Sequence, residues 1–287
     1  MVNYLDATLQ SEQAACWLAE QMGLAFNHRR YTRVFVNGVR RGELMEDSQK
    51  PNRDYVEEWF PNAPDGELYK LQFHVEGDAA GRTGEGALAR ALLKYSAPSN
   101  TPPATAYRWT WNKRVVQGTN NDFRSVFDLV DAFNRKDNQE FTTQVSALIE
   151  VEQWMRTFAV ERAVGNWDSF GYANDQNMYF YKPPHGRWQL CIWDMDMPMG
   201  TAGAYPATDG ILSNGNVSTP EPRFLRHPPF CRAYLRVLHD VMNSPVGRIG
   251  PLLDAKAAVF ATNGINAASP QGLKTTWPLG PPPSTGN

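Results

Sequence analysis

The chain has 287 residues, with 28 Lys and Arg against 30 Asp and Glu, so its formal net charge is −2. A chain of this length can bury the core of one large domain or of two modest lobes. The small charge argues against a protein that wraps nucleic acid, which needs a basic surplus or stripe. No apolar run reaches the roughly 18–20 residues that span a bilayer.

The first half of the chain predicts a helix followed by a β-hairpin. Residues 6–22 predict an amphipathic helix, because apolar residues recur at helical spacing up to Gly23. Residues 33–45 predict the hairpin, because Asn37-Gly38 between apolar runs suits a turn with positive φ at both central residues. Three further segments complete this half: a short helix at 53–60, an extended segment at 66–75 and an irregular stretch at 97–121.

The second half predicts a mainly helical region that carries another hairpin. Residues 140–164 predict a long helix of about 40 Å, at roughly 1.5 Å per residue, ended by Gly165. Strands at 178–181 and 188–193, joined by Pro-Pro-His-Gly, predict the hairpin. The other expected segments are helices at 123–133, 230–242 and 250–261, and a mobile tail rich in Pro and Gly at 263–287.

Polar side chains gather where the second hairpin opens. The long helix delivers Asp168 into the loop that follows it, and the hairpin begins at Asn177 and returns to Asp194 and Asp196. Because hairpin strands pair antiparallel, we expect Asn177 and Asp194 to lie close together near Asp168. The three carboxylates repel one another without a cation, and together with the carboxamide they supply hard oxygen ligands of the kind that suits Mg²⁺ or Mn²⁺.

Protein kinases are built from the same order of parts. They have a helix, a loop with a base Asp, a metal-binding Asn, a hairpin and a metal-binding Asp. The gap between the base and the Asn is about five residues in kinases, whereas Asp168 and Asn177 are nine residues apart. The HRD and DFG motifs and the Gly-rich phosphate loops are absent. The loop after Asp168 must therefore have a different shape.

These residues resemble the CotH family of spore-coat kinase-like proteins. The resemblance is carried by N-W-D at 166–168, N-M-Y-F-Y at 177–181, Trp188, and W-D-M-D at 193–196 followed by Gly200. Upstream, VNG at 36–38, GELME at 42–46 and LYK at 68–70 are similar to further segments of the family. The resemblance extends from about residue 6 to residue 200 and is most specific from 168 onward.

The resemblance implies an α+β, atypical protein kinase-like fold. It would comprise a partial small lobe at about 1–78, a mainly helical larger lobe at about 79–262 and a flexible tail at 263–287. The implied activity is transfer of phosphate from ATP to Ser or Thr of a coat or surface protein, with Mg²⁺ or Mn²⁺, at an extracellular, surface or spore-coat location. Asp168 would be the catalytic base, Asn177 and Asp194 would hold metal, and Asp196 would be a second ligand or an orienting neighbour.

Two further residues would lie on the nucleotide side. Glu12 has the position of the kinase Glu that pairs with a nucleotide-gripping Lys, yet only eleven residues precede it. We therefore expect a truncated N-terminus or an incomplete small lobe. Lys70 is the substitute candidate for gripping phosphate. The plain alternatives are an exposed helix residue for Glu12 and a solvated strand lysine for Lys70, and we expect Arg29-Arg30 and Glu46 to face solvent.

Simpler roles also remain open for the central residues. Asp168 could only accept backbone N–H groups in a turn, and Asn177 could only cap the strand entry. A non-catalytic binding or coat-assembly module could use the same fold, because fold does not dictate activity. A metal-dependent phosphoesterase is a third function, which we rank last because no His lies near Asp194 in the sequence.

Overall fold

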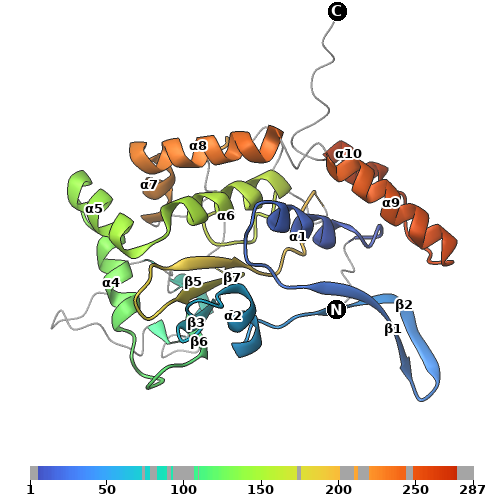
Figure 1. The fold of residues 1–287 in the computed structure, drawn as a ribbon, viewed down its shortest axis with the longest axis horizontal. Helices are drawn as coiled ribbons and strands as arrows, with labels where there is room; N and C mark the ends of the chain where they lie inside the picture. Colours follow the sequence, from blue (N-terminus) through green and yellow to red (C-terminus); the bar gives the residue numbers. More distant parts are fainter. Residues whose placement is uncertain are drawn as a thin grey trace, which may run out of the picture.

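A computed structural model describes residues 6–72, 75–77, 83–88, 92, 107–108, 110–172, 176–200, 210–212, 220–243 and 248–276. Its elements, in chain order, are α1 Ser11–Gln21, β1 Arg29–Val36, β2 Val39–Ser48, α2 Arg53–Trp59, β3 Glu67–Leu71, β4 Val75–Gly77, β5 Thr83–Leu88, β6 Trp111–Val115, α4 Arg124–Phe133, α5 Asn138–Leu148, α6 Val151–Val164, β7 Met178–Lys182, β8 Gln189–Ile192, α7 Pro220–Arg226, α8 Pro228–Asn243, α9 Ile249–Thr262 and α10 Gln271–Thr276. The predicted α+β class is therefore confirmed (Figure 1).

A four-stranded antiparallel sheet, in the order β6-β3-β7-β8, occupies the centre of the molecule (Figure 1). Strands β7 and β8 form the predicted hairpin, and Met178 pairs with Ile192 at its open end. On its other side β7 pairs with β3, which places Lys70 opposite Tyr179. A lysine more than a hundred residues away in the sequence is thereby brought into the sheet that carries the hairpin.

Helices cover both faces of this sheet. Phe180 of β7 packs against Trp154 of α6, with ring centroids 5.4 Å apart. Tyr181, the next residue of β7, stacks on Phe60 just after α2, with centroids 4.3 Å apart. Neighbouring residues of a strand point to opposite faces, so burial on both sides explains why the strand is apolar or aromatic almost throughout.

The core between the sheet and α6 is largely aromatic. Its large rings, all within the main cluster of buried side chains, are Trp111, Trp154, Phe158, Phe170, Phe180, Trp188 and Phe224. Rings of this size dominate the free energy of a core and pack in edge-to-face or tilted geometry. The hairpin β7–β8 is therefore anchored along its length and presents its open end from a rigid base.

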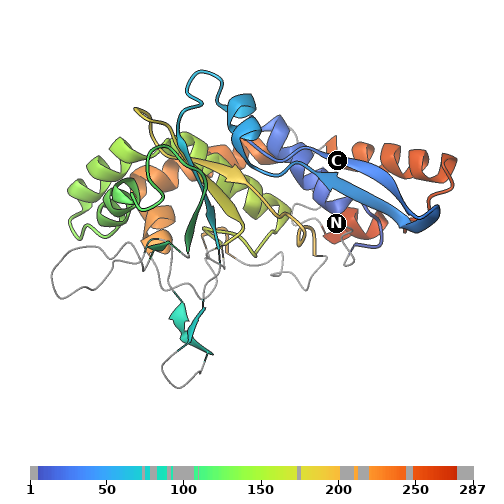
Figure 2. The same ribbon diagram turned by 90° about the horizontal axis from the view of Figure 1, so that it is seen from below.

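The hairpin β1–β2 is a separate two-stranded sheet that reaches away from the central sheet, alongside α9 (Figures 1 and 2). Its turn is the predicted one, since Asn37 and Gly38 have φ of 51° and 77°. The base of the hairpin packs on α9, where the ring of Tyr31 lies 5.1 Å from that of Phe260. The expected hairpin of residues 33–45 is thus confirmed, with strands that extend further along the chain.

The expected single helix at 140–164 is wrong, because the chain breaks between α5 and α6. Ile149 is extended, with φ of −118° and ψ of 152°, and bridges Trp188. Trp188 N–H donates to the carbonyl of Leu148 at 2.7 Å, and Glu150 N–H donates to the carbonyl of Trp188 at 3.0 Å. Hydrogen bonds to the start of β8 replace helical ones, so a long-range contact overrides local helix propensity.

Other differences from the expected elements are smaller. The helix expected at 6–22 begins only at Ser11, because the Asp6 carboxylate accepts the N–H groups of Gln10 and Ser11 at 2.8 and 2.7 Å and holds the preceding residues in a turn. Strand β6 lies in the stretch expected to be irregular, and α10 lies in the expected tail, where Leu273 is buried. Residues 97–106 and 277–287 lie outside the described part. No described helix has both the length and the apolar character that crossing a membrane requires.

Candidate functional site

The end of α6 forms a hydrogen-bonded turn that leads to Asp168. Gly165 takes the left-handed conformation with φ of 69°, and Asn166 N–H bonds back to the carbonyl of Glu161 at 3.0 Å. The Asn166 side-chain amide donates to the buried carboxyl of Glu161 at 2.8 Å, and the Ser169 hydroxyl donates to the carbonyl of Asn166 at 3.0 Å. These bonds tie the loop to the helix on both sides of Asp168.

Asp168 is buried and held by two amide side chains at the entry of β7. The amide nitrogen of Asn177 donates to its carboxylate Oδ2 at 2.9 Å and to its carbonyl at 3.0 Å. The amide nitrogen of Gln176 donates to Oδ1 at 2.7 Å. The expected proximity of Asp168 and Asn177 is therefore observed, and each carboxylate oxygen has a fixed donor.

Left-handed backbone marks both sides of the open end of the hairpin. Asn177, just before β7, has φ of 54°, and Asp194, two residues after β8, has φ of 60°. A side chain in this region costs about 1 kcal/mol or more, and such residues cluster at functional sites. The strain lies at the two positions to which the sequence assigns metal ligands.

Asp194 belongs to an electrostatic cluster that includes Lys70. Burial raises the pKa of Asp194, the cations of Lys70 and Arg29 oppose that rise, and the charge of Asp168 adds to it. Burial lowers the pKa of the half-buried Lys70, and Asp194 opposes that change. The Lys70 ammonium also lies 5.7 Å from the ring centre of Trp193. Four segments of the chain thus bring their charges together here.

Asp196 is the third carboxylate of the cluster. Burial, together with the charges of Asp194 and Asp168, raises the pKa of Asp196 to about 6. Met195, between the two aspartates, is buried, whereas Asp194 and Asp196 are both partly exposed. After burial, repulsion from neighbouring carboxylates is a further cause of the raised pKa values of Asp194 and Asp196, and a bound cation would relieve that repulsion.

The oxygen atoms of Asn177 and Asp194, at the open end of the hairpin β7–β8, suit a hard divalent cation. Because Asn177 uses its amide nitrogen on Asp168, its amide oxygen is the atom that could act as a ligand, beside the carboxylate of Asp194. Within the described ranges, His, Cys, Asp and Glu side chains nowhere gather in threes as a metal-ligand set. Mg²⁺ commonly takes only one or two carboxylates and completes its shell with water and substrate phosphates. The chemistry suits that arrangement rather than a closed protein cage.

Glu12 is buried against Arg29, which corrects two expectations. The Arg29 side chain is 8% exposed and contacts the carboxylates of Glu12 and Glu46, the latter at 2.8 Å. Arg29 and Glu46 therefore do not face solvent, and the partner of Glu12 in the structure is an arginine. The pKa of Glu12 is raised to about 8, and burial is the largest cause. Arg29 opposes this rise, whereas the charges of Glu46, Asp196 and Asp194 add to it.

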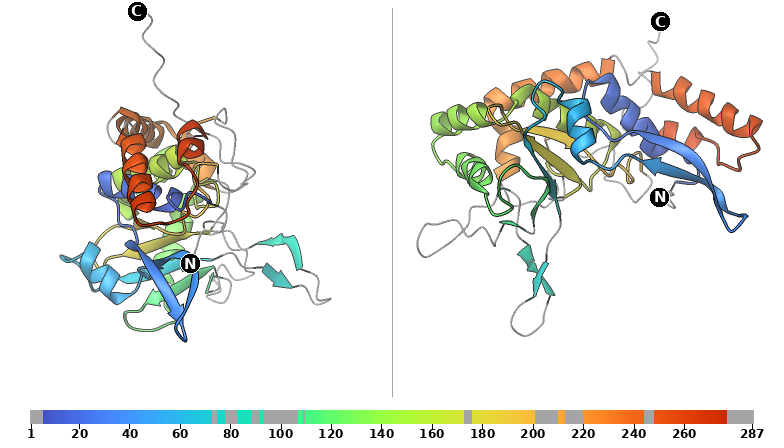
Figure 3. Two further views of the ribbon diagram at one scale, coloured as in Figure 1. Left: turned by 90° about the vertical axis from the view of Figure 1, so that its right-hand side faces the viewer. Right: turned by 60° about the horizontal axis from the view of Figure 1, so that its bottom comes forward.

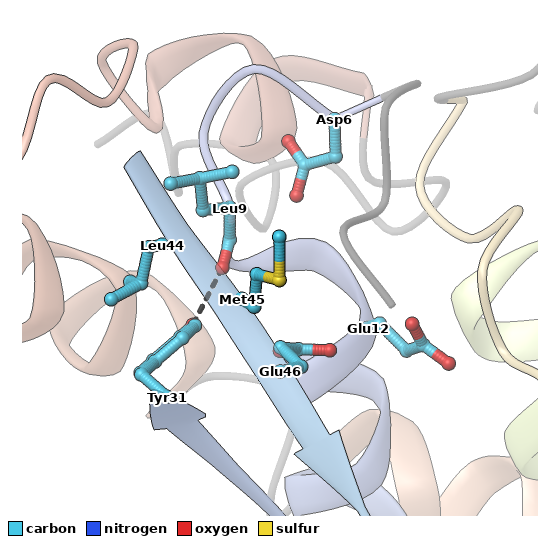
Figure 4. Close-up of a pocket in the computed structure, with 7 residues that line it drawn as sticks. All are labelled: Asp6, Leu9, Glu12, Tyr31, Leu44, Met45 and Glu46. Atoms are coloured by element: carbon cyan, nitrogen blue, oxygen red, sulfur yellow. Dashed lines mark hydrogen bonds between the residues drawn. The ribbon is translucent and has the colours of Figure 1, made fainter. Parts of the chain in front are cut away.

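A pocket opens between α1 and the hairpin β1–β2 (Figure 4). Seven residues line it: Asp6, Leu9, Glu12, Tyr31, Leu44, Met45 and Glu46. The carboxylates of Glu12 and Glu46 lie at one end of the pocket (Figure 4). Because Glu12 also feels the charges of Asp194 and Asp196, this pocket adjoins the carboxylate cluster instead of forming an unrelated site.

Sequence reasoning missed three residues that shape the site: Gln176, Glu161 and Arg29. A signal existed for Arg29, since a two-residue turn at Asn37-Gly38 would place it opposite Glu46 on the neighbouring strand. The observed register is shifted by a bulge between Thr32 and Val34, yet the two charges still meet. No comparable pattern pointed to Gln176 or Glu161.

Comparison with known families agrees with this geometry. A family model described as CotH kinase protein matches residues 2–246, a range that contains every residue of the candidate site. The comparison with curated proteins gave no match. The family match spans most of the chain and includes both hairpins and the helices between them. This protein is therefore a member of the CotH kinase protein family.

Proposed function

We propose that this protein transfers the terminal phosphoryl group of ATP to a Ser or Thr hydroxyl of another protein, with Mg²⁺ or Mn²⁺. The observation that supports the proposal best is the position of Asp168. Its carboxylate is oriented by Gln176 and Asn177 and lies in the same electrostatic cluster as Asp194. An oriented base beside oxygen ligands and a lysine is what phosphoryl transfer requires of a protein.

In this proposal Asp168 orients the acceptor hydroxyl and takes its proton. The hydroxyl oxygen forms a bond to the phosphorus while the bond between that phosphorus and the leaving ADP oxygen breaks. Asn177 and Asp194 would hold the cation, with Asp196 as a neighbouring ligand or an orienting group. When bound, the cation neutralises charge on the phosphate oxygens.

Lys70 and Glu12 are the proposed residues on the nucleotide side. Lys70 lies within electrostatic range of Asp194, so its ammonium can meet the oxygens of a phosphate bound to the cation. Glu12 acts through Arg29, which it contacts and whose charge also reaches Asp194 and Asp196. We propose a coat or surface protein as the acceptor, in keeping with the family of the chain.

The direct test is incorporation of labelled phosphate from ATP into casein and into the protein itself, with Mn²⁺ or Mg²⁺. We expect Asp168→Asn and Asp194→Asn each to lower the rate about 100-fold or more, and EDTA to abolish it. Asp47→Asn is the matched control, because Asp47 is an exposed aspartate of β2 paired with Arg30. Unchanged rates in both site variants would refute the assignment.

A non-catalytic assembly module is the second candidate. The observation that favours it is the burial of Glu12 against Arg29, which occupies a carboxylate that a kinase would use for its lysine. The two functions separate in a thermal unfolding experiment with ATP and Mn²⁺, because a ligand that binds only the folded state raises the melting temperature. A rise that Asp194→Asn removes favours the kinase, and no rise together with no transfer favours the assembly module.

A further inference from the structure

The far end of the hairpin β1–β2 concentrates exposed apolar side chains. We call residues 33–42 the hairpin tip. Eight large hydrophobic side chains are exposed in the described part of the chain, and three of them lie in the tip: Phe35 at 60%, Val36 at 44% and Val39 at 58%. Single exposed hydrophobic residues are ordinary, whereas a contiguous group marks a surface that another body covers.

The same ten residues carry a one-sided charge. Arg33, Arg40 and Arg41 are exposed, and the tip contains no Asp or Glu, although the whole chain has a net charge of −2. Arg33 donates to the carbonyl of Asn263, just after α9, at 3.1 Å, and the next acidic residue along the chain is Glu43. Basic residues therefore outnumber acidic ones at this end of the hairpin, which favours an anionic partner.

The apolar side chains of the tip lie on both faces of the ribbon. Phe35 pairs with Arg40, and the next pair towards the turn is Val36 with Val39. Side chains of successive pairs point to opposite faces of a two-stranded sheet. Phe35 and Arg40 therefore lie side by side on one face, and Val36 and Val39 lie on the other, where Arg41 follows further from the turn.

The tip also projects from the body of the molecule. The far part of the hairpin diverges from α9 towards its turn (Figures 1 and 3). Docking on a flat protein surface would cover one face of this ribbon and leave the other in water. Immersion in a fluid apolar layer covers both faces at once, while the long side chains of Arg40 and Arg41 can extend their charged ends to its polar boundary.

We propose that the hairpin tip inserts into an anionic lipid surface. Phe35, Val36 and Val39 would enter the boundary between headgroups and acyl chains, and Arg40 and Arg41 would meet lipid phosphates. From residue 35 to the turn the strands cover about 7 Å, at roughly 3.4 Å per residue, which matches the depth of about 5–10 Å typical of interfacial segments. This inference requires neither the proposed phosphotransfer activity nor a membrane-spanning segment.

The test is co-sedimentation of the full chain with vesicles. Vesicles of phosphatidylglycerol and phosphatidylcholine are compared with vesicles of phosphatidylcholine alone, at low and high NaCl. One variant combines Phe35→Ser, Val36→Ser and Val39→Ser, and a second combines Arg40→Gln and Arg41→Gln. The matched control combines Leu235→Ser and Met242→Ser, two exposed hydrophobic residues of α8. All variants keep Asn37-Gly38, and equal melting temperatures verify that they fold.

We expect the wild type and the α8 control to bind the anionic vesicles, with weaker binding at high salt. The serine variant should bind at least tenfold more weakly, because burying a Phe alone changes a partition coefficient by about that factor. Each arginine removed should weaken binding about fivefold. The proposal is overturned if the wild type does not bind anionic vesicles, or if the serine variant binds as well as the wild type. It is also overturned if polyglutamate, but no vesicle, binds at the tip.

Discussion

The two hairpins β7–β8 and β1–β2 are the same kind of unit in opposite surroundings. Helices cover both faces of β7–β8, and residues Met178–Tyr181 are buried without exception. Exposure in β1–β2 increases towards the turn, where residues 35–42 are all exposed. In our proposals the open end of the buried hairpin carries site residues for phosphotransfer, whereas the turn of the exposed hairpin contacts a lipid surface.

This contrast shows that burial decides what a hairpin can do. The open end of β7–β8 is anchored by aromatic packing and can therefore hold Asn177 and Asp194 in a strained backbone. The tip of β1–β2 lacks such packing, so it cannot hold a reacting geometry. Its exposed side chains can only contribute by contact with something outside the chain.

The largest expected effect is the loss of core packing in the buried hairpin. Phe180 is fully buried against rings of Trp111, Trp154 and Phe170. We expect Phe180→Ala to lower the free energy of unfolding by about 3–5 kcal/mol. The matched variant Phe35→Ala, in the exposed hairpin, should change it by less than about 0.5 kcal/mol. Urea denaturation measures both, and equal losses would contradict the contrast between the hairpins.

Local signals made part of the fold predictable. The Asn37-Gly38 turn and the strand pairs on either side of it depend on neighbouring residues, so the sequence was sufficient. Strand β6 was missed because it exists through pairing with β3, some forty residues earlier. The break at Ile149 was missed for the same reason, since its partner is Trp188. Long-range pairing decides these segments more than local composition does.

In the candidate site, too, some contacts could be predicted from the local sequence and others could not. Closure of one hairpin places Asn177 and Asp194 at the same open end, so this placement followed from the sequence. The contact of Arg29 with Glu12 depends on how α1 docks beside a different hairpin, and nothing local encodes that docking. The hydrogen bond of Gln176 to Asp168 depends on the loop between them, whose length departs from the kinase pattern.

The second largest expected effect concerns Glu161, whose buried carboxyl accepts a hydrogen bond from Asn166 in the loop that carries Asp168. Burial raises the pKa of Glu161 from 4.5 to about 8, so the folded protein favours its protonated form. Its contribution to stability is complete below pH 4.5 and is lost as the pH rises towards about 8. The difference in free energy of unfolding between wild type and Glu161→Gln should therefore change across this window, by up to about 1.4 kcal/mol per pH unit.

Glu161→Gln is the informative variant because glutamine can still accept the bond from Asn166. Urea denaturation of both proteins at several pH values isolates Glu161 from Glu12 and Asp196, which titrate in both. A difference that stays constant with pH would show that Glu161 is ionised in the folded protein.

The third effect measures the strain at the open end of β7–β8. Asp194 has φ of 60°, a conformation that glycine adopts without cost and alanine does not. Asp194→Gly should therefore be more stable than Asp194→Ala by about 1 kcal/mol. Both variants remove the same carboxylate, so the comparison isolates the backbone, and thermal unfolding measures it. Equal stability would mean that this residue carries no strain in solution.

The smallest effect belongs to the turn of the exposed hairpin. Gly38 has φ of 77°, and a Cβ added there would meet no atom within 4 Å. Gly38→Ala should therefore cost only backbone strain, about 1 kcal/mol. Because the tip is exposed and can open without the core, we expect faster amide exchange at Val36 and Val39 and unchanged exchange in β7–β8. If exchange in β7–β8 also rises, the two hairpins unfold as one unit and do not behave as independent parts.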